Sequence, residues 1–464
     1  MNDLYYMSAK DLGMLLKERK LSPVELTKIM LDRIDQLDDT LRTYITPLHE
    51  TALKQAREAE NKIMKGEYLG PLHGIPVGIK DNQYTMGIRT TDGSKLFANF
   101  YPSETATVVS KLVLAGIVML GKQNLHELAA GSTGTNPYFG TTRNPWNIEY
   151  MPGGSSGGGA ASLAAGLATL ATGSDTFGSI RVPAAMCGVY GLKPTHGLVS
   201  AHRVFPTAWS LDTIGPIARS VGDLALMLQV MAGYDPHDPA SLRVPVPNYS
   251  EDLNKNIKGL TIGVPTHYME NLDEDVDKLF HQAVSTLKSL GVEIKEVVIP
   301  ELEMATFAGY ATVSGEAAAF HHQWLKTHAE DYSPDIRSFF LAGSLIEARQ
   351  YIQAQQARRS IVQAFERAFG EVDMLLGPTI PIMTPKFKEN WVEQNLDVVK
   401  RIMPYTVPIN LTGVPALAVP IGLDRYGLPV GMQFIGSHLT EKQLLQIGHN
   451  WEQVNPLQIK ITDD

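Results

Sequence analysis

Apolar residues recur at helical spacing in the first part of the chain. The apolar positions that fall three or four residues apart are Leu26, Ile29, Met30, Ile34 and Leu37. This spacing is typical of a helix with one buried face. The preceding Ser22-Pro23-Val24-Glu25 is typical of a capping box with proline at the first helical position. We therefore predict an N-terminal helical segment within residues 1–66.

Beyond Gly70 the pattern changes to short apolar runs broken by glycine and proline. The runs GIPVGIKD (74–81) and GIVMLGKQN (116–124) predict strands, and residues 106–115 between them predict a helix. Residues 272–300 add a helix followed by a strand, with Gly291 as the predicted helix C-cap. Because strands alternate with helices, we predict an α/β fold with a mostly parallel or mixed sheet.

Residues 300–400 are helical in pattern and rich in aromatic side chains. The aromatic positions are Phe307, Tyr310, Phe320, Trp324, Phe339 and Phe340. Such clusters are more often core than pocket, but this one is also the leading candidate for substrate contacts. The sequence has no internal repeat and no low-complexity tract. We predict one domain over residues 1–464, with residues 300–400 as an elaboration on the substrate side.

Charge and cysteine content exclude several classes of protein. A net charge of −9 argues against binding to nucleic acid or to an anionic membrane. The single cysteine, Cys187, excludes an intramolecular disulfide and fits a reducing compartment. The N-terminus lacks the pattern of a signal peptide, and the apolar stretch 160–170 is too short to span a bilayer. We therefore expect a cytoplasmic protein with neither membrane nor nucleic-acid partners.

Three glycine-rich stretches each contain one residue able to attack carbon or to move a proton. These residues are Lys80, Ser155 and Ser179. A serine is a weak nucleophile until a base activates it, and no histidine lies within the three stretches. The apolar residues before Lys80 favour burial, which lowers the pKa of a lysine and makes it a base. This combination indicates acyl transfer by a serine–lysine device.

Other interpretations of these stretches fit less well. The glycine run 153–159 passes directly into an alanine-rich helix, unlike a flexible linker, and it lacks the lysine of a phosphate-binding loop. It also lacks the βαβ context of a dinucleotide loop. His126-Glu127 begins a zinc motif, but alanine stands at position 130, where the second histidine would be needed. These stretches therefore predict neither a nucleotide loop nor a zinc site, and acyl transfer by serine and lysine requires no metal and no organic cofactor.

The segments GIPVGIKD, PGGSSGGGAA and GSDTFGSIRVPAAMCGVYGLKPTHG closely resemble the signature region of the amidase signature family of serine hydrolases. The similarity extends from near Ser22 to the C-terminal NLTGVPALAVPIGLDRYGLPVGMQFIG, which is most of the chain. It implies a single large α/β domain, in which helices flank both faces of a mixed central sheet. It also implies hydrolysis of amide bonds without a cofactor.

The resemblance assigns a role to each residue of a Ser-cisSer-Lys triad. It implies that Lys80 is the general base and Ser179 the nucleophile that carries the acyl group. Ser155, which follows a cis peptide bond from Gly154 in this family, would pass the proton between them. Ser156 would then be mainly structural.

The resemblance also implies an oxyanion hole and a supporting pair. The backbone N–H groups of Thr176, Phe177, Gly178 and Ser179 would bind the oxyanion, since fixed donors in a dry site stabilise developing charge strongly. Asp175 and Arg181 resemble the polar pair of the family. Phe177 stands where glycine is usual, and its ring would narrow the acyl pocket or add an apolar wall.

Two substrate hypotheses follow, and a third hypothesis is a catalytically dead binding module. Phe177 and Met403 favour a small-molecule amide with an apolar or aromatic acyl group; esters, anilides and carbamates share the chemistry. The alternative is the glutamine-hydrolysing subunit of an aminoacyl-tRNA amidotransferase, which would need partner subunits and tRNA. Arg359 resembles the arginine that holds the glutamine carboxylate there, but Met403 falls where an acidic residue would hold the amino group. A homo-oligomer stays open.

Overall fold

A mixed β-sheet runs through the molecule. Its strands are β1 (Tyr44–Pro47), β2 (Pro76–Lys80), β3 (Val118–Gln123), β4 (Leu170–Asp175), β5 (Tyr190–Lys193), β6 (Thr213–Ala218), β7 (Thr261–Pro265), β8 (Glu293–Val297), β9 (Met374–Pro378), β10 (Ala416–Leu423) and β11 (Pro429–Ile435). The computed structural model describes residues 4–458, and over these residues the strand order is β1-β3-β2-β4-β6-β5-β10-β11-β9-β7-β8. The pairs β3-β2, β2-β4, β9-β7 and β7-β8 are parallel, and the others are antiparallel. The predicted mixed α/β sheet is confirmed.

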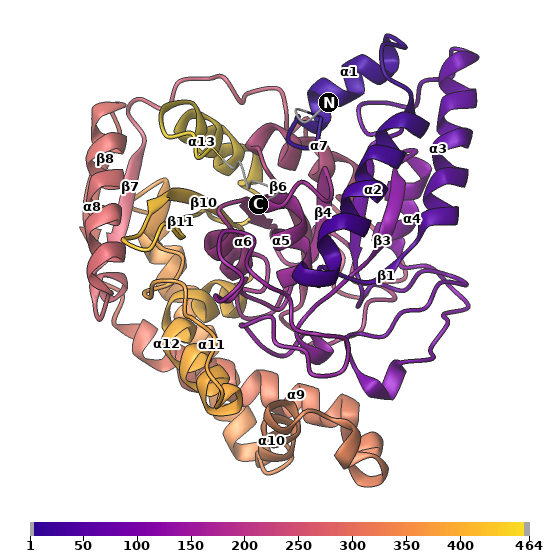
Figure 1. Ribbon diagram of the computed structural model, residues 1–464. Helices are drawn as coiled ribbons and strands as arrows, with labels where there is room; N and C mark the ends of the chain where they lie inside the picture. Colours follow the sequence, from indigo (N-terminus) through magenta and orange to yellow (C-terminus); the bar gives the residue numbers. More distant parts are fainter. Residues whose placement is uncertain (1–3, 459–464) are drawn as a thin grey trace.

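Helices pack against the sheet along its whole length (Figure 1). They are α1 (Ala9–Lys17), α2 (Pro23–Leu41), α3 (His49–Met64), α4 (Thr107–Leu114), α5 (Gly157–Ala164), α6 (Arg181–Cys187), α7 (Val221–Met231), α8 (Glu274–Ser289), α9 (Ala305–Thr327), α10 (Pro334–Gly343), α11 (Ala348–Phe369), α12 (Trp391–Thr412) and α13 (Glu441–Val454). Short 3₁₀ turns connect several of them. None of the helices in the described range 4–458 has the length and apolar character needed to cross a membrane.

Two helices show that both faces of the sheet are covered. On β11, the side chain of Gln433 accepts a hydrogen bond from Arg181 of α6. The next residue, Phe434, pairs with Leu417 of β10, and the Leu417 side chain lies against Gly448 of α13. Successive strand residues point to opposite faces, so α6 and α13 lie on opposite sides of the sheet. Helices therefore flank both faces, as the family resemblance implies.

The N-terminal segment contains the predicted helices and also a strand. Ser22 caps α2, because its Oγ accepts from the backbone N–H groups of Val24 (3.0 Å) and Glu25 (3.2 Å). Its hydroxyl donates to Glu60 of α3 at 2.5 Å, which ties the two helices together. Between these helices the chain adds β1 at the edge of the sheet. Periodicity alone predicted only the helices.

Residues 300–400 form a helical layer at one end of the sheet. In Figure 1, α9 to α12 gather below the strands. They enclose a second apolar core that includes Ala308, Phe365 and Val407. The same stretch also supplies β9, which lies between β11 and β7 in the central sheet. The region is therefore part of the sheet as well as a cover over it.

Candidate active site

Parallel pairing brings the first two site residues together. Lys80 is the last residue of β2, and Asp175 is the last residue of the neighbouring parallel strand β4. The carboxyl ends of parallel strands meet at the same edge of a sheet, so residues far apart in the sequence become neighbours there. The Lys80 backbone N–H donates to Thr172 Oγ1 on β4 at 2.9 Å, which fixes the approach of the two strands. The predicted site residue Lys80 therefore lies at this edge, beside Asp175.

The side-chain nitrogen of Lys80 lies among serine hydroxyls. Its Nζ is 2.8 Å from Ser155 Oγ and 2.8 Å from Ser174 Oγ. Ser174 Oγ also accepts from Asn82 Nδ2 at 3.0 Å. Lys80 and Ser155 are fully buried. The predicted contact between Lys80 and Ser155 is present, and Ser174 is a further contact that the motif analysis missed.

Burial sets the protonation of Lys80. It lowers the pKa of this lysine to about 7, although Asp92, Asp175 and Asp212 act in the opposite direction. Only a neutral lysine can accept a proton, so kcat/KM is expected to rise with pH and to level off above a limb near pH 7. A pH profile of kcat/KM measures the limb. A limb near pH 10.5, the ordinary value for lysine, would contradict a buried catalytic base.

Glycines allow the chain to approach Lys80 at Ser155. The Gly154–Ser155 peptide bond is cis, as the resemblance implies. A Cβ on Gly154 would lie 2.8 Å from the backbone N of Gly134, and one on Gly153 would lie 2.7 Å from Pro183 Cα. No side chain fits at either position. The glycine run is therefore a close-packed turn that leads into α5.

Ser156 connects the two serine segments. Its backbone N–H donates to the Ser179 carbonyl at 3.2 Å, and its Oγ lies 3.3 Å from both the N and the O of Ser174. No hydrogen bond joins the hydroxyls of Ser155 and Ser179 anywhere in the described part of the chain. Catalytic hydrogen bonds are often loose before substrate binds. The structure thus joins Lys80 to Ser155 directly and joins Ser155 to Ser179 only through neighbouring backbone.

A buried carboxylate shapes the segment that carries Ser179. Asp175 Oδ1 accepts the Gly178 N–H at 2.9 Å, and Oδ2 accepts the Ile180 N–H at 3.2 Å. Gly178 has φ +104°, and a Cβ there would lie 2.8 Å from Thr406. Glycine is therefore required at position 178 by both conformation and space. The turn points Ser179 toward a cavity.

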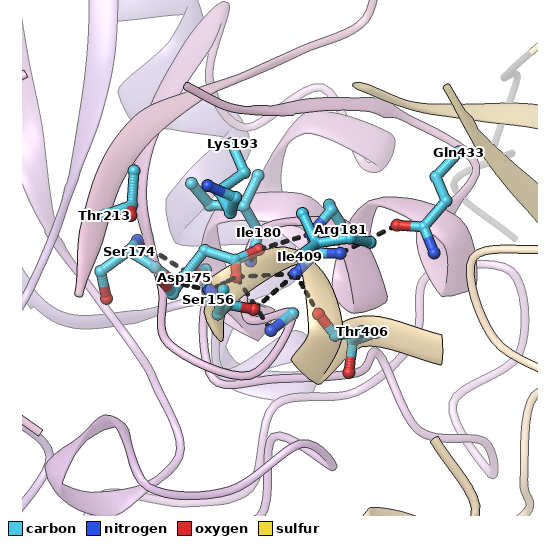
Figure 2. A network of polar contacts seen from close by, with 12 residues as sticks. Ser156, Ser174, Asp175, Ile180, Arg181, Lys193, Thr213, Thr406, Ile409 and Gln433 are labelled. Carbon is cyan, nitrogen blue, oxygen red and sulfur yellow. Dashed lines mark hydrogen bonds and ion pairs between the residues drawn. The ribbon is translucent and has the colours of Figure 1, made fainter. Parts of the chain in front are cut away.

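Arg181 holds Asp175 from the other side (Figure 2). Its Nε and Nη2 donate to the two Asp175 oxygens at 3.1 Å each, and both side chains are fully buried. Nη1 reaches Gln433 at 2.8 Å, and Nη2 also reaches Asn410 at 2.8 Å. Burial opposes ionisation of Asp175, but Arg181, Lys193 and Asn410 together outweigh it and hold the pKa of this carboxyl below its usual range. Asp175 is thus ionised and paired, as the resemblance implies.

One of the four expected oxyanion donors is already used. The Gly178 N–H donates to Asp175, so it does not point freely into the cavity. Among the described residues, the N–H groups of Thr176, Phe177 and Ser179 donate to no protein acceptor. The expectation for Gly178 is corrected because the carboxylate that shapes the turn also occupies its donor. The other three N–H groups stay available.

Ser179 opens into a cavity of about 640 Å³. Phe177, Tyr310, Phe339 and Met403 contribute to its walls. The Phe177 ring also lies against Gly309 of α9, where a Cβ would be 3.4 Å from ring atoms. Phe307 lines the cavity too. The predicted aromatic cluster therefore divides, because Trp324 and Phe340 pack instead into a separate apolar core.

A polar group in the cavity wall escaped the motif analysis. Asp335 of α10 accepts from Asn395 Nδ2 of α12 at 2.9 Å and lies 3.1 Å from His126 Nε2. The His126 backbone N–H donates to the Ser155 carbonyl at 3.2 Å. These contacts tie the two covering helices to the Ser155 turn. Within residues 4–458 no group of three or more His, Cys, Asp or Glu side chains could hold a metal ion.

Comparisons with known proteins agree with this geometry. The family model described as Amidase matches residues 25–445. The A subunit of the glutamyl-tRNA(Gln) amidotransferase of Carboxydothermus hydrogenoformans is 42% identical over 97% of this chain and 98% of its own length. The native peptide amidase of Stenotrophomonas maltophilia is 30% identical, with a TM-score of 0.86 and coverage of 99% of both chains.

A second solved structure is closer in shape. It belongs to work on an unexpected vestigial protein complex that reveals the evolutionary origins of an s-triazine catabolic enzyme. It is 31% identical, has a TM-score of 0.92, and the match covers 98% of this chain and 100% of that one. The family match spans most of the sequence, and the relatives cover nearly all of it. The chain belongs to the amidase family and is an amide-hydrolysing enzyme.

Proposed function

We propose that this enzyme cleaves its amide through an acyl-enzyme on Ser179. The observation that carries the proposal is the 2.8 Å contact between buried Lys80 and Ser155, beside the segment from which Ser179 opens into the cavity. Neutral Lys80 draws a proton from Ser155, and Ser155 takes one from Ser179. The Ser179 oxygen then attacks the carbonyl carbon. The proton returns through Ser155 to the leaving amine as the C–N bond breaks.

Water completes the cycle by the same route. It loses a proton through Ser155 to Lys80 and attacks the acyl carbon. The bond to the Ser179 oxygen then breaks, the acid leaves, and the proton returns from Lys80 through Ser155 to Ser179. The N–H groups of Thr176, Phe177 and Ser179 stabilise the negative oxygen in both halves, since preorganised donors need no rearrangement when charge develops. Ser174 and Asn82 hold the Lys80 side of the relay. Ser156, Asp175 and Arg181 support the two serine segments.

The relatives favour glutamine as the amide. We expected an apolar or aromatic amide as the main hypothesis, but a relative named as the A subunit of a glutamyl-tRNA(Gln) amidotransferase aligns over almost the whole chain. This supports the glutamine alternative better than the main hypothesis. On this proposal the enzyme acts within a complex whose other subunits use the released ammonia.

The cavity favours an apolar acyl group as the second candidate. Met403 lines it, at the position where the resemblance places the acidic residue that holds the amino group of glutamine. Arg359 does not line the cavity. The adjacent Arg358 is already bound to the Leu411 carbonyl (2.7 Å) and to Ser210. Neither arginine is placed to hold a substrate carboxylate, which favours an apolar amide, although the charged side chains of Glu303, Asp335 and Lys400 also line the cavity.

Hydrolysis of a small panel by the purified chain tests both candidates. The panel is glutamine, a short aliphatic amide, an aromatic amide, an anilide and a carbamate, with Ser179→Ala as the control. Loss of all turnover in Ser179→Ala supports the acyl-enzyme, and turnover equal to that of the wild type contradicts it. Glutamine as the only substrate supports the amidotransferase role, whereas turnover of apolar amides with glutamine inert supports the second candidate.

A further inference from the structure

A second buried carboxylate, Asp212, lies beside the oxyanion segment. Asp175 at the end of β4 pairs with Thr213 at the start of β6, and the two strands are antiparallel. The next pair in this register is Thr176 and Asp212. Asp212 Oδ1 accepts the Thr176 hydroxyl at 2.5 Å. The sheet register thus brings a carboxylate to a residue that carries one of the free N–H groups.

Asp212 also binds a second segment that lines the cavity. Its Oδ2 accepts the Thr207 N–H at 2.9 Å, and both oxygens lie 3.1 Å from the Ala208 nitrogen. The Thr207 hydroxyl continues to the Leu128 carbonyl at 3.1 Å. Thr176 and Thr207 both line the cavity that Ser179 opens into. One carboxylate therefore contacts two segments that line the cavity.

No cation lies within salt-bridge distance of Asp212 in the part of the chain that the structure describes. Three hydrogen-bond donors of the protein contact its carboxylate instead. Because hydrogen bonds are directional, these contacts fix the orientation of the donor groups as well as stabilise the negative charge. We propose that Asp212 is a positioning residue of the hydrolysis reaction, which aims the Thr176–Phe177 N–H groups at the oxyanion and supplies negative charge near Lys80. The proposal rests on the acyl-enzyme function of Ser179.

The charged groups around the site define the electrostatic part of this role. Burial raises the pKa of Asp212 to about 7, and Glu316 of α9 adds to the rise. Ionised Asp212 raises the pKa of Lys80, as do Asp92 and Asp175, while burial lowers it by more. Arg358 of α11 faces the same loop through Ser210. Removal of the Asp212 charge is therefore expected to lower the pKa of Lys80 further.

The nearly isosteric variants Thr176→Val and Asp212→Asn separate the positioning role of Asp212 from its electrostatic role. Thr176→Val removes the hydroxyl that Asp212 holds but keeps the carboxylate. We expect it to lower kcat by at least about tenfold and to change KM by less than about threefold. An N–H group that no longer points at the oxyanion stabilises the transition state less, while substrate binding is little affected. Thr176→Ser should restore kcat to within about threefold of the wild type. In Thr176→Ser the acidic limb of kcat/KM stays in place, because serine keeps the hydrogen bond to Asp212.

Asp212→Asn removes the charge and keeps the shape. Its acidic limb is expected to move to lower pH, since Lys80 then stays neutral in more acid solution. Glu316→Gln is the matched control, because Glu316 binds Ser210 of the same loop (2.7 Å) and does not touch Thr176. Glu316 raises the pKa of Asp212, so its loss keeps Asp212 ionised and should not move the limb to lower pH. We expect this control to keep kcat within about twofold of the wild type. Thermal unfolding checks that each variant is folded.

The possible results are distinguishable. Wild-type kcat in Thr176→Val overturns the positioning role, and a folded Asp212→Asn with an unmoved limb overturns the electrostatic role. If Asp212→Asn does not fold, the difference in kcat between Thr176→Val and Thr176→Ser tests the positioning role by itself. If Ser179→Ala is inactive but the Asp212 and Thr176 variants keep wild-type activity, only the inference about Asp212 is overturned. An active Ser179→Ala removes the proposed function itself.

Discussion

Lys80→Met is expected to lower kcat by at least about 10⁴-fold while the protein stays folded. Methionine is similar in length to lysine and suits a fully buried site, so the fold loses no packing. It has no nitrogen to accept the proton from Ser155, and no other group within hydrogen-bond distance of Ser155 Oγ in the described chain can replace it. Single-turnover and steady-state assays with the best substrate of the panel measure the effect.

A second buried lysine provides the control. Lys193 is also fully buried, and burial lowers its pKa to about 7 as well. Its Nζ donates to the Pro194 carbonyl at 2.9 Å and, within the described residues, has no serine partner. Lys193→Met should keep kcat within about tenfold of the wild type. Equal losses in the two variants would show that burying methionine, rather than removing the base, caused the effect.

Asp175→Asn is expected to destabilise the protein by about 3–5 kcal/mol. The fully buried guanidinium of Arg181 would lose its carboxylate partner, and an unpaired buried charge is costly. The amide of asparagine also cannot accept both the Gly178 and the Ile180 N–H groups as the carboxylate does. Urea unfolding followed by circular dichroism gives the change in the free energy of unfolding.

An exposed ion pair shows what the same change costs at the surface. Arg203 and Glu104 lie 2.5 Å apart, with side chains 43% and 54% exposed. Glu104→Gln should change the free energy of unfolding by less than about 1 kcal/mol, because solvent screens exposed pairs. A similar small change in Asp175→Asn would mean that the Arg181 network contributes little to stability.

The motifs predicted much of the site because they are local. Lys80, Ser155 and Ser179 each stand in a short stretch whose glycines allow close packing, and the contact between Lys80 and Ser155 followed from the resemblance. Their catalytic roles stay predictions. The sheet was predictable as mixed, but its order was not, since β9 lies in a stretch with a helical pattern. Pairing between distant strands leaves no periodic signal.

Residues that become neighbours only through strand pairing could not be predicted from the sequence. Asp212 stands 33 positions after Ser179, in an ordinary apolar stretch, and becomes a neighbour of Thr176 only through the β4–β6 pairing. Ser174 precedes Asp175 by one residue, yet nothing in the pattern indicated that its side chain would point at Lys80. The hydrogen bond from the Gly178 N–H to Asp175 could not be predicted either, because it depends on the orientation of the Asp175 side chain.

The close packing around Gly309 limits how this lineage can evolve. A Cβ at position 309 would lie 2.3 Å from Val407 of α12, whereas the Phe177 ring would stay at an ordinary contact distance of 3.4 Å. A larger residue at 309 is therefore excluded while Val407 is present, whatever the residue at 177. Position 177 can shrink without penalty from α9. Among homologous sequences, positions 309 and 407 should covary, and histories that enlarge the acyl pocket can begin at 177.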